Sequence, residues 1–266
     1  MNKVKAKKQF GQHFLKSQDV VKKIVDEVDI KEDDTILEIG PGTGILTEEI
    51  LKRNPNKLYS VEIDKSLYPL LEEKFKEYKN FELVKSDIFD VNIKEIAASK
   101  KLKVVGNLPY NVASLIMINC VFNMEVVDFC VFMIQKEVAE KLIAKPKTKS
   151  YTFLSVFMQT FFDIKYIMSV PARFFSPPPK VTSAVIKLTP YNRFGIKDIK
   201  KYKNFVSHLF TDRRKMIRSK LDQSILEKAN IKPTLRAEEL NVEDFVRLFE
   251  VVKNDDRKFG DADSHS

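Results

Sequence analysis

The chain has 266 residues and a formal net charge of +9; 44% of its residues are hydrophobic and 31% are charged. This length and composition predict a soluble globular protein with one sizeable core and a second, smaller unit, and they exclude an intrinsically disordered chain. The longest apolar-rich run, residues 126–134, contains Asp128 and is too short to span a bilayer.

The first two thirds of the sequence predict alternating helices and strands. Valines and isoleucines at helical spacing follow Ser17 and Asp19, so one of these two residues is expected to cap a helix. Strands are then expected at residues 35–39, 57–63, 81–85, 103–106, 126–134, 164–170 and 181–188. Helices are expected at residues 45–52, 67–78, 113–122, 136–143 and 151–161. The alternation up to residue 143 predicts a parallel α/β sheet covered by helices on both faces, with residues 164–170 and 181–188 as late strands.

Two later segments interrupt this pattern. Residues 174–179 include three prolines and are expected to stay outside any sheet ladder. Pro190, Asn192 and Gly195 are turn-forming residues and mark a break in the pattern. After this break, helices are expected at residues 198–210, 213–226 and 242–252. We therefore predict a first domain over residues 1–190, a small helical domain over residues 191–254, and a disordered polar tail over residues 255–266.

The positive charge is concentrated in two segments. Residues 1–23 hold seven lysines and one acidic residue, Asp19. Residues 197–220 hold nine lysines or arginines against Asp198 and Asp212. Two separate basic segments favour a polyanionic partner, and the alternative is an ordinary solvated lysine-rich surface.

The cysteines and histidines predict neither a metal site nor a disulfide framework. Cys120 and Cys130 are the only cysteines, and the three histidines are scattered without a zinc-ligand spacing. The lysine-rich N-terminus also lacks the apolar segment and cleavage site of a secretory signal. We expect both cysteines to be small core residues of a cytoplasmic protein.

Residues with ligand-binding chemistry stand at successive predicted strand ends. Gly40, Gly42 and Gly44 follow the first strand and precede a helix, so the backbone there can approach a ligand closely. Their G-x-G-x-G spacing differs from the G-x-G-x-x-G of pyrophosphate-binding turns. Glu62 ends the next strand, where an acid can hold a ribose diol, and Asp87 follows the third. Because ligands of open α/β sheets bind outside the carboxyl ends of the strands, these residues are predicted to line one crevice.

The fourth strand end reads Asn107-Leu108-Pro109-Tyr110. Asn and Pro are frequent in ordinary turns, and taken alone this stretch is compatible with one. Its position beside the other three strand ends instead favours a place in the crevice. Pro109 fixes its own φ and biases Leu108 toward an extended conformation, which can aim the Leu108 carbonyl beside the Asn107 side chain.

These motifs resemble those of class I S-adenosylmethionine-dependent methyltransferases. EIGPGTG (residues 38–44) is similar to their glycine motif, VEID (61–64) to their ribose-binding acid, and SDIF (86–89) to the acid that contacts the adenine amine. NLPY (107–110) is similar to the signature of the amino-methylating members. Four longer stretches resemble the KsgA family, in the expected order: KKQFGQHFL (7–15), NLPYNVAS (107–114), FSPPPKVTSAV (175–185) and DRRKMIRSKL (212–221). The resemblance covers residues 5–250.

The resemblance implies a fold, an activity and partners. The fold is a Rossmann-like class I methyltransferase sheet with helices on both faces, followed by a small all-helical C-terminal domain. The activity is S-adenosylmethionine-dependent dimethylation of N6 of two adjacent adenosines near the 3′ end of small-subunit ribosomal RNA during ribosome biogenesis. The partners are the small ribosomal subunit and its RNA. No membrane association is expected, and the free protein is expected to be a monomer.

The resemblance also implies site residues. Cofactor contacts are expected at His13, Leu15, Gly40, Gly42, Glu62, Ile63, Asp87, Ile88 and Asn107. The reacting base is expected to meet Asn107, Leu108, Pro109, Tyr110 and Phe175, with Tyr110 and Phe175 stacking on its two faces. For that role Phe175, which stands beside three prolines, is expected to be exposed. Phosphate contacts are expected at Lys5, Lys7, Lys8, Lys180, Arg213, Arg214, Lys215 and Arg218. His13 stands where the family often has Asn, and a neutral imidazole can supply the same hydrogen bond.

Three alternatives stay open at this point. The first is an Erm-type enzyme, which modifies large-subunit RNA; the triple proline and the NLPYN stretch disfavour it. The second is a non-catalytic RNA-binding or assembly protein with the same fold, which the intact set of cofactor residues disfavours. The third is a nicotinamide dehydrogenase, which the glycine spacing and the Asn-Leu-Pro-Tyr ending disfavour.

Overall fold

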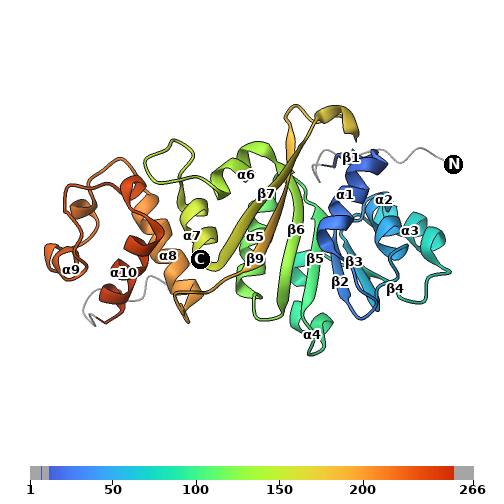
Figure 1. The fold of residues 1–266 in the computed structure, drawn as a ribbon, viewed down its shortest axis with the longest axis horizontal. Helices are drawn as coiled ribbons and strands as arrows, with labels where there is room; N and C mark the ends of the chain where they lie inside the picture. The colour runs from blue at the N-terminus through green and yellow to red at the C-terminus, as the bar shows by residue number, and fades with distance from the viewer. Residues whose placement is uncertain (1–6, 8–11, 255–266) are drawn as a thin grey trace. The chain divides into compact units, whose positions relative to one another are not determined.

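The computed structural model of the chain describes residue 7 and residues 12–254 (Figure 1). The chain divides into two compact units. The first holds the described residues up to 139 and residues 162–190, and the second holds residues 140–161 and the described residues from 191 onward. Residues 140–161 thus belong to the second unit, and a change of unit falls after residue 190. The functions predicted for the two domains stay predictions, and the predicted disordered tail, residues 255–266, lies outside the described residues.

The first unit is built on a seven-stranded sheet in the order β4-β3-β2-β5-β6-β9-β7. Its strands are β2 (Thr35–Ile39), β3 (Lys57–Glu62), β4 (Phe81–Lys85), β5 (Leu102–Asn107), β6 (Val127–Gln135), β7 (Phe162–Val170) and β9 (Ser183–Pro190). The five strands from β4 to β6 pair in parallel, and β9 pairs antiparallel with both β6 and β7. The predicted parallel sheet is confirmed for these five strands, and the two predicted late strands extend it as β9 and β7. No crossover helix joins β7 to β9, so the chain returns beside β7 in the opposite direction.

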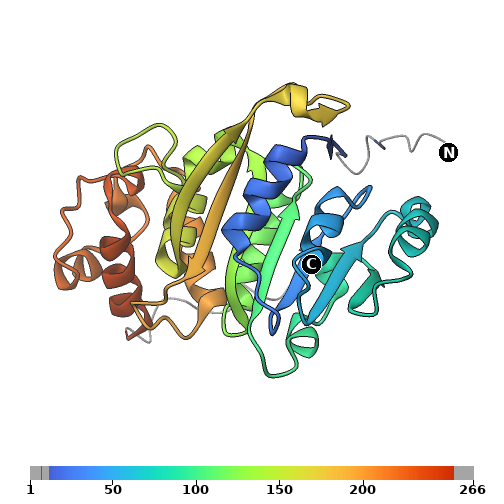
Figure 2. The same ribbon diagram turned by 45° about the vertical axis from the view of Figure 1, so that its right-hand side comes forward.

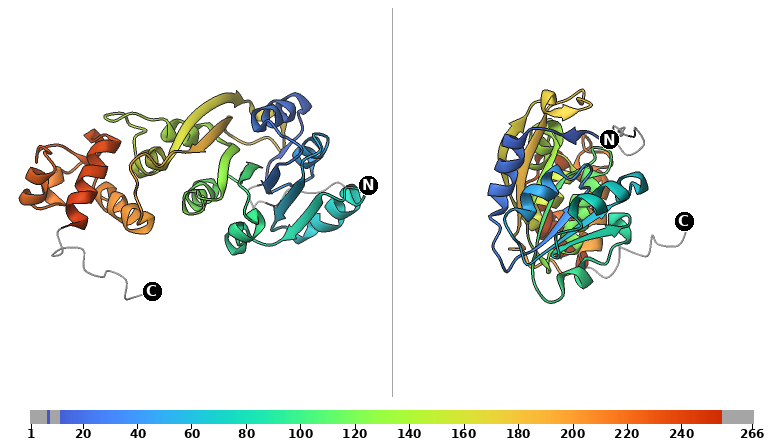
Figure 3. Two further views of the ribbon diagram at one scale, coloured as in Figure 1. Left: turned by 60° about the horizontal axis from the view of Figure 1, so that its bottom comes forward. Right: turned by 90° about the vertical axis from the view of Figure 1, so that its right-hand side faces the viewer.

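Helices cover both faces of this sheet. They are α1 (Gln18–Val28), α2 (Ile45–Leu51), α3 (Tyr68–Phe75), α4 (Ile93–Ala97) and α5 (Ala113–Phe122). Figures 2 and 3 show α1 and α2 on one face and α5 on the other. Ser17 caps α1 by accepting a hydrogen bond from the Val20 backbone, which confirms that predicted start. The buried face of α1 packs into a core beneath β2, whose five residues are all buried.

A second, two-stranded sheet was not predicted. Strand β1 (Phe14–Leu15) pairs antiparallel with β8 (Phe175–Ser176). The expectation that residues 174–179 stay outside any ladder is therefore wrong for Phe175 and Ser176. The pairing ends before the first of the three prolines, so the ladder needs no hydrogen bond from a proline nitrogen.

The second unit is helical. It contains α7 (Phe153–Phe161), α8 (Ile199–Phe210), α9 (Gln223–Lys228) and α10 (Val242–Lys253), while α6 (Lys136–Leu142) contains the boundary between the units. Aromatic rings from three helices meet around the buried Tyr202, with Phe157, Phe161 and Phe249 as its neighbours. None of the described helices has the length and apolar character needed to cross a membrane.

The predicted helix at residues 213–226 is wrong. Only a short 3₁₀ helix (Ile217–Ser219) and α9 form in that range. Met216 adopts an extended conformation and forms an antiparallel bridge with Arg236, and the Ile217 nitrogen donates to the Leu235 carbonyl over 2.6 Å. These pairings take the backbone groups that a continuous helix would use, so a contact distant in sequence overrides the local helical pattern.

Candidate active site

A pocket lies at the carboxyl ends of β2, β3, β4 and β5. Each of these strand ends brings residues predicted from the sequence: the glycine turn at β2, Glu62 and Ile63 at β3, Asp87 and Ile88 at β4, and residues 107–110 at β5. The pocket is also lined by four residues that precede α1 in the sequence: Gln12, His13, Phe14 and Leu15. Parallel strands end at the same edge of a sheet, and this places the four segments together. The individual roles of these residues stay predictions.

The glycine turn brings backbone to the pocket wall. Gly40 and Gly42 have φ values of 70° and 58°, in the left-handed region that glycine adopts without strain. A Cβ atom on Gly42 would lie 3.0 Å from the Phe14 ring. The turn therefore needs glycine at residue 42 both for its conformation and for the close approach of Phe14.

Glu62 is fixed at the end of β3 and is only 4% exposed. Its Oε1 accepts a hydrogen bond from the Asp64 nitrogen over 2.8 Å, and its Oε2 accepts one from the Gly42 nitrogen over 3.2 Å. Burial raises the pKa of Glu62, and the backbone hydrogen bonds from Asp64 and Gly42 oppose that rise. A carboxylate held in this way keeps lone pairs that can accept hydrogen bonds from a bound diol.

The end of β4 supplies an acid and one apolar side chain, and a second apolar side chain follows β3. Asp87 accepts a hydrogen bond from the Phe89 nitrogen over 3.1 Å and so caps the short 3₁₀ helix Ile88–Asp90. Phe89 and Ile63 also line the pocket, and both are substantially exposed, at 46% and 44%. Phe89 was not predicted as a site residue, although an aromatic residue close to an acid at a strand end could have indicated it. Apolar walls beside a carboxylate suit a planar heterocycle.

Asn107 is oriented by the N-terminal segment. Its Nδ2 donates to the His13 carbonyl over 2.9 Å, so its Oδ1 is left as the acceptor. His13 Nδ1 donates to the Pro177 carbonyl over 2.9 Å, and the His13 ring stacks on Tyr110 with centroids 5.5 Å apart. The predicted hydrogen-bonding group at residue 13 thus lies in the pocket with its Nδ1 already paired.

Tyr110 is held by a residue that the sequence did not single out. Its hydroxyl shares a 2.6 Å hydrogen bond with the hydroxyl of Ser183, a buried residue at the start of β9. Burial raises the pKa of Tyr110, and the Ser183 hydrogen bond opposes the rise. The Tyr110 ring is therefore fixed at one end while it lines the pocket.

Phe175 does not lie where it was expected. Its side chain is 1% exposed, belongs to the same core cluster as Leu15, and is not among the residues that line the pocket. The expectation that it is exposed is wrong. Pairing with β1 turns alternate side chains to opposite faces, so Phe175 points into the core and Ser176 outward.

The predicted phosphate-binding residues differ in their surroundings. Lys180, Arg214, Lys215 and Arg218 are exposed. Arg213 donates to the Lys149 carbonyl over 3.2 Å and pairs with Glu238 at 3.4 Å, so it also holds the second unit together. Lys7 pairs with Asp64 at 2.7 Å. Lys5 and Lys8 lie outside the described residues.

A buried acid stands directly beneath the glycine turn. Glu38 on β2 has no exposed surface, and its Oε2 accepts hydrogen bonds from Thr47 and Ser60 over 2.7 and 2.6 Å. Its Oε1 has no hydrogen-bond partner among the residues that the structure describes. Burial raises the pKa of Glu38 to about 7, although the two hydroxyl hydrogen bonds lower it. In the sequence Glu38 was noted only as the first residue of the EIGPGTG motif, and its full burial was not predicted.

Glu38 is expected to make stability depend on pH. Because its pKa is about 7 in the folded state against an ordinary 4.5, the folded protein binds the extra proton between these values. Raising the pH through this window should therefore cost up to about 3 kcal/mol of the free energy of unfolding. Glu38→Gln should remove this loss, so its stability relative to the parent protein should be higher at pH 8 than at pH 5. Urea unfolding of both proteins at the two pH values measures the difference, and an equal difference at both would contradict the assignment.

The chain is similar to known methyltransferases in sequence and in fold. Two proteins named ribosomal RNA small subunit methyltransferase A match it: one from Sulfurihydrogenibium sp. (strain YO3AOP1), 68% identical over 97% of this chain and 100% of the relative, and one from Persephonella marina, 61% identical over 94% of each. A dimethyladenosine transferase from Plasmodium falciparum has the same fold, with a TM-score of 0.80 at 24% identity over 91% of this chain and 98% of that one.

A second solved structure and a family model complete the comparison. The 23S rRNA methyltransferase ErmE matches with a TM-score of 0.68 at 26% identity, over 90% of this chain and 99% of that one. The family model of ribosomal RNA adenine dimethylases matches residues 3–254. The chain therefore belongs to the ribosomal RNA adenine dimethylase family of methyltransferases.

Proposed function

We propose that this protein uses S-adenosylmethionine to dimethylate N6 of two adjacent adenosines near the 3′ end of small-subunit ribosomal RNA during ribosome biogenesis. One observation carries the proposal: Asn107, Leu108, Pro109 and Tyr110 line the same pocket as the glycine turn, Glu62 and Asp87. The names of the relatives at 68% and 61% identity support the small subunit as the source of the RNA. This activity would place the protein in the cytoplasm with the assembling subunits.

The residues of the pocket fit the cofactor. When bound, S-adenosylmethionine supplies a methyl group that its sulfonium makes strongly electrophilic. We assign the ribose hydroxyls to Glu62 and the adenine amine to Asp87, with Ile63 and Ile88 as the apolar walls. His13, Leu15, Gly40, Gly42 and Asn107 complete the set of contacts. Positive-φ glycines at the turn allow the backbone to lie directly against the ligand.

The remaining residues deal with the acceptor amine. The N6 lone pair of adenine is delocalised into the ring and is a poor nucleophile. Asn107 Oδ1 and the Leu108 carbonyl can accept the two N6 hydrogens and hold the amine toward a tetrahedral shape. Tyr110 can stack on the base once it leaves its helix. Catalysis then comes from positioning and from exclusion of water, without a nucleophile supplied by the protein. A second transfer requires that the pocket also admit the monomethylated amine, which has lost one hydrogen.

Removing the Glu62 carboxylate is expected to weaken cofactor binding. Glu62→Ala should cost about 1–3 kcal/mol of binding free energy, the value of hydrogen bonds to a charged group. Calorimetry with S-adenosylmethionine on the folded variant measures this loss. Glu82→Ala serves as the control, because Glu82 is an exposed residue on β4 that does not line the pocket. Undiminished affinity in Glu62→Ala would remove Glu62 from the site.

Base mapping tests the whole proposal. The protein and labelled cofactor are incubated with unmethylated small subunits and, separately, with large subunits, and the modified bases are mapped. We expect dimethylation of two neighbouring adenosines in the small-subunit RNA only. Modification of large-subunit RNA would favour an Erm-type enzyme instead. Subunit binding without transfer or cofactor uptake would favour a non-catalytic assembly protein, and family membership already excludes the dehydrogenase.

A further inference from the structure

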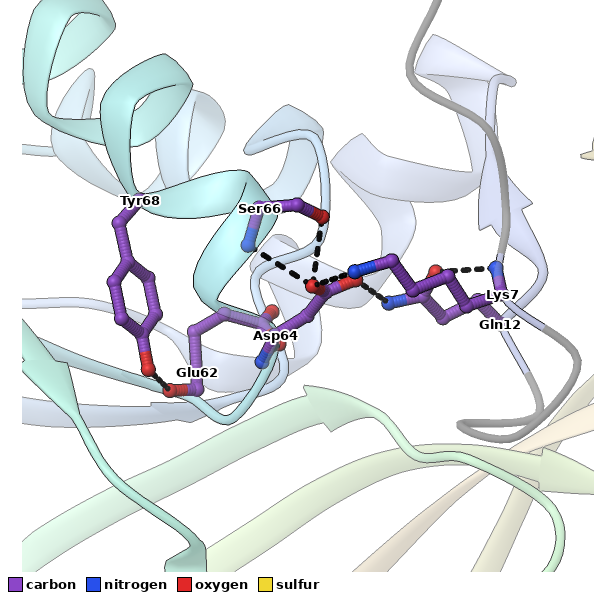
Figure 4. Close-up of polar contacts among 6 residues, drawn as sticks. All are labelled: Lys7, Gln12, Glu62, Asp64, Ser66 and Tyr68. Carbon is purple, nitrogen blue, oxygen red and sulfur yellow. Dashed lines mark hydrogen bonds and ion pairs between the residues drawn. The ribbon is translucent and has the colours of Figure 1, made fainter.

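A buried carboxylate beside the pocket binds the N-terminal segment (Figure 4). Asp64 follows β3, is 2% exposed and does not line the pocket. Its Oδ1 lies 2.7 Å from Lys7 Nζ, and its Oδ2 accepts a hydrogen bond from Gln12 Nε2 over 2.9 Å. Ser66 donates to Oδ1 from its nitrogen and its hydroxyl, over 3.0 and 2.7 Å. Both oxygens of this buried charge are thus held by hydrogen bonds, two of them from residues far away in the sequence.

The environment of Asp64 keeps it ionised. Burial alone would raise the pKa of Asp64, but the hydrogen bonds from Lys7, Ser66 and Gln12 outweigh that effect and lower it to about 2. Lys7 and Gln12 are also bonded to each other, because the Lys7 nitrogen donates to Gln12 Oε1 over 2.9 Å. Charge-assisted bonds of this kind are stronger than neutral ones. They fasten one end of the segment that reaches the pocket.

Residues 12–15 contact both the pocket and the Asn107 side chain. Gln12, His13, Phe14 and Leu15 line the pocket, and the His13 carbonyl accepts the hydrogen bond from Asn107 Nδ2. At its other end the segment is held by the two-residue strand β1, by burial of Leu15 in the core, and by the hydrogen bond from the Lys16 nitrogen to the Phe174 carbonyl over 2.9 Å. A two-stranded ribbon of this length adds little stability by itself. The Asp64 contacts hold Gln12 on the other side of His13, so the His13 backbone lies between two points of attachment.

We infer that Asp64 is a positioning residue for methyl transfer: by holding Lys7 and Gln12, it fixes residues 12–15 so that the His13 carbonyl orients Asn107. This inference rests on the proposed function, because it assigns Asn107 Oδ1 to the acceptor amine. The Asp64 backbone nitrogen also donates a hydrogen bond to Glu62 Oε1, so Asp64 directly contacts the residue assigned to the ribose hydroxyls. The competing role for Asp64 is a local one, the capping of the 3₁₀ helix Lys65–Leu67 through Ser66.

Lys7→Ala separates the two roles, because it removes the ion pair and leaves the Ser66 cap in place. S-adenosylmethionine affinity is to be measured by calorimetry in the absence of RNA, so that phosphate contacts of Lys7 cannot contribute. Affinity should fall about 3- to 10-fold in Lys7→Ala and by at least as much in Asp64→Asn. The variant that combines Lys7→Ala with Asp64→Asn should bind the cofactor no more weakly than Asp64→Asn alone, because both changes break the same ion pair. Lys7→Arg should restore most of the affinity.

A matched control and a second readout complete the test. Lys57 pairs with Glu82 at 2.9 Å in the same unit, away from the pocket, and Lys57→Ala should leave the affinity unchanged. Single-turnover transfer at saturating cofactor should also fall several-fold in Asp64→Asn, since a misplaced His13 releases Asn107. A role in capping alone would lower the melting temperature without either change. Equal affinity and transfer in the parent protein and both variants would overturn the inference and leave the proposed function intact. If the parent protein binds no cofactor, the proposed function itself fails.

Discussion

Replacing Asn107 by alanine is expected to cut methyl transfer by at least about a hundredfold, the scale of losing one positioned polar group at a reacting centre. The melting temperature should change little, because the only bond that the Asn107 side chain is seen to make within the described residues is the one to the His13 carbonyl. In the proposed mechanism the lost Oδ1 accepts a hydrogen bond from the reacting amine, so its removal should affect transfer and not the fold. Some loss of cofactor affinity is also expected, since Asn107 lines the pocket to which the cofactor is assigned.

Single-turnover transfer to saturating unmethylated small subunits with saturating cofactor measures this effect without a contribution from binding. Tyr110→Phe is the matched control in the same loop. It keeps the ring stacked on His13 and loses only the hydrogen bond to Ser183, so it should remain largely active. Near-normal transfer by Asn107→Ala would show that residues 107–110 are an ordinary turn.

Reversing three exposed charges in the second unit is expected to weaken small-subunit binding by at least about a hundredfold. The change is Arg214→Glu, Lys215→Glu and Arg218→Glu in one protein. Arg213 is left in place, because its bonds to Lys149 and Glu238 would confuse lost binding with lost folding. Cofactor affinity should not change, since none of the three residues lines the pocket.

The salt dependence distinguishes phosphate contacts from a general charge effect. If the three side chains each neutralise one phosphate, the slope of log affinity against log salt should become shallower by about three. Lys79→Glu, Lys101→Glu and Lys253→Glu, at exposed positions outside both basic segments, change the net charge equally and should have a much smaller effect. Subunit binding that survives the reversal at residues 214, 215 and 218 would mean that this surface faces another partner.

Much of the fold and the outline of the pocket could be predicted because they depend on local patterns. Short apolar runs alternating with amphipathic segments were enough to place β2, β3, β4, β5 and β6. Central strands such as β2 and β5 are buried and mostly apolar, and β4 at the sheet edge was recognised from the alternation. The strand ends of a parallel sheet meet at one edge, so Glu62, Asp87 and Asn107 could be expected in one crevice without a structure. Resemblance then assigned roles that spacing alone left open.

Tertiary structure decided every feature that depends on a partner distant in sequence. Phe175 is buried because it pairs with β1, and residues 213–226 do not form one helix because Met216 and Ile217 pair with residues 235 and 236. Asp64 appeared in the sequence only as the last letter of VEID, and its contacts with Lys7 and Gln12 are visible only in the folded chain. A single sequence carries propensity and periodicity, which act over a few residues. Which distant backbone groups and charges satisfy each other is settled by the packing of the whole unit, and that is why these contacts required the structure.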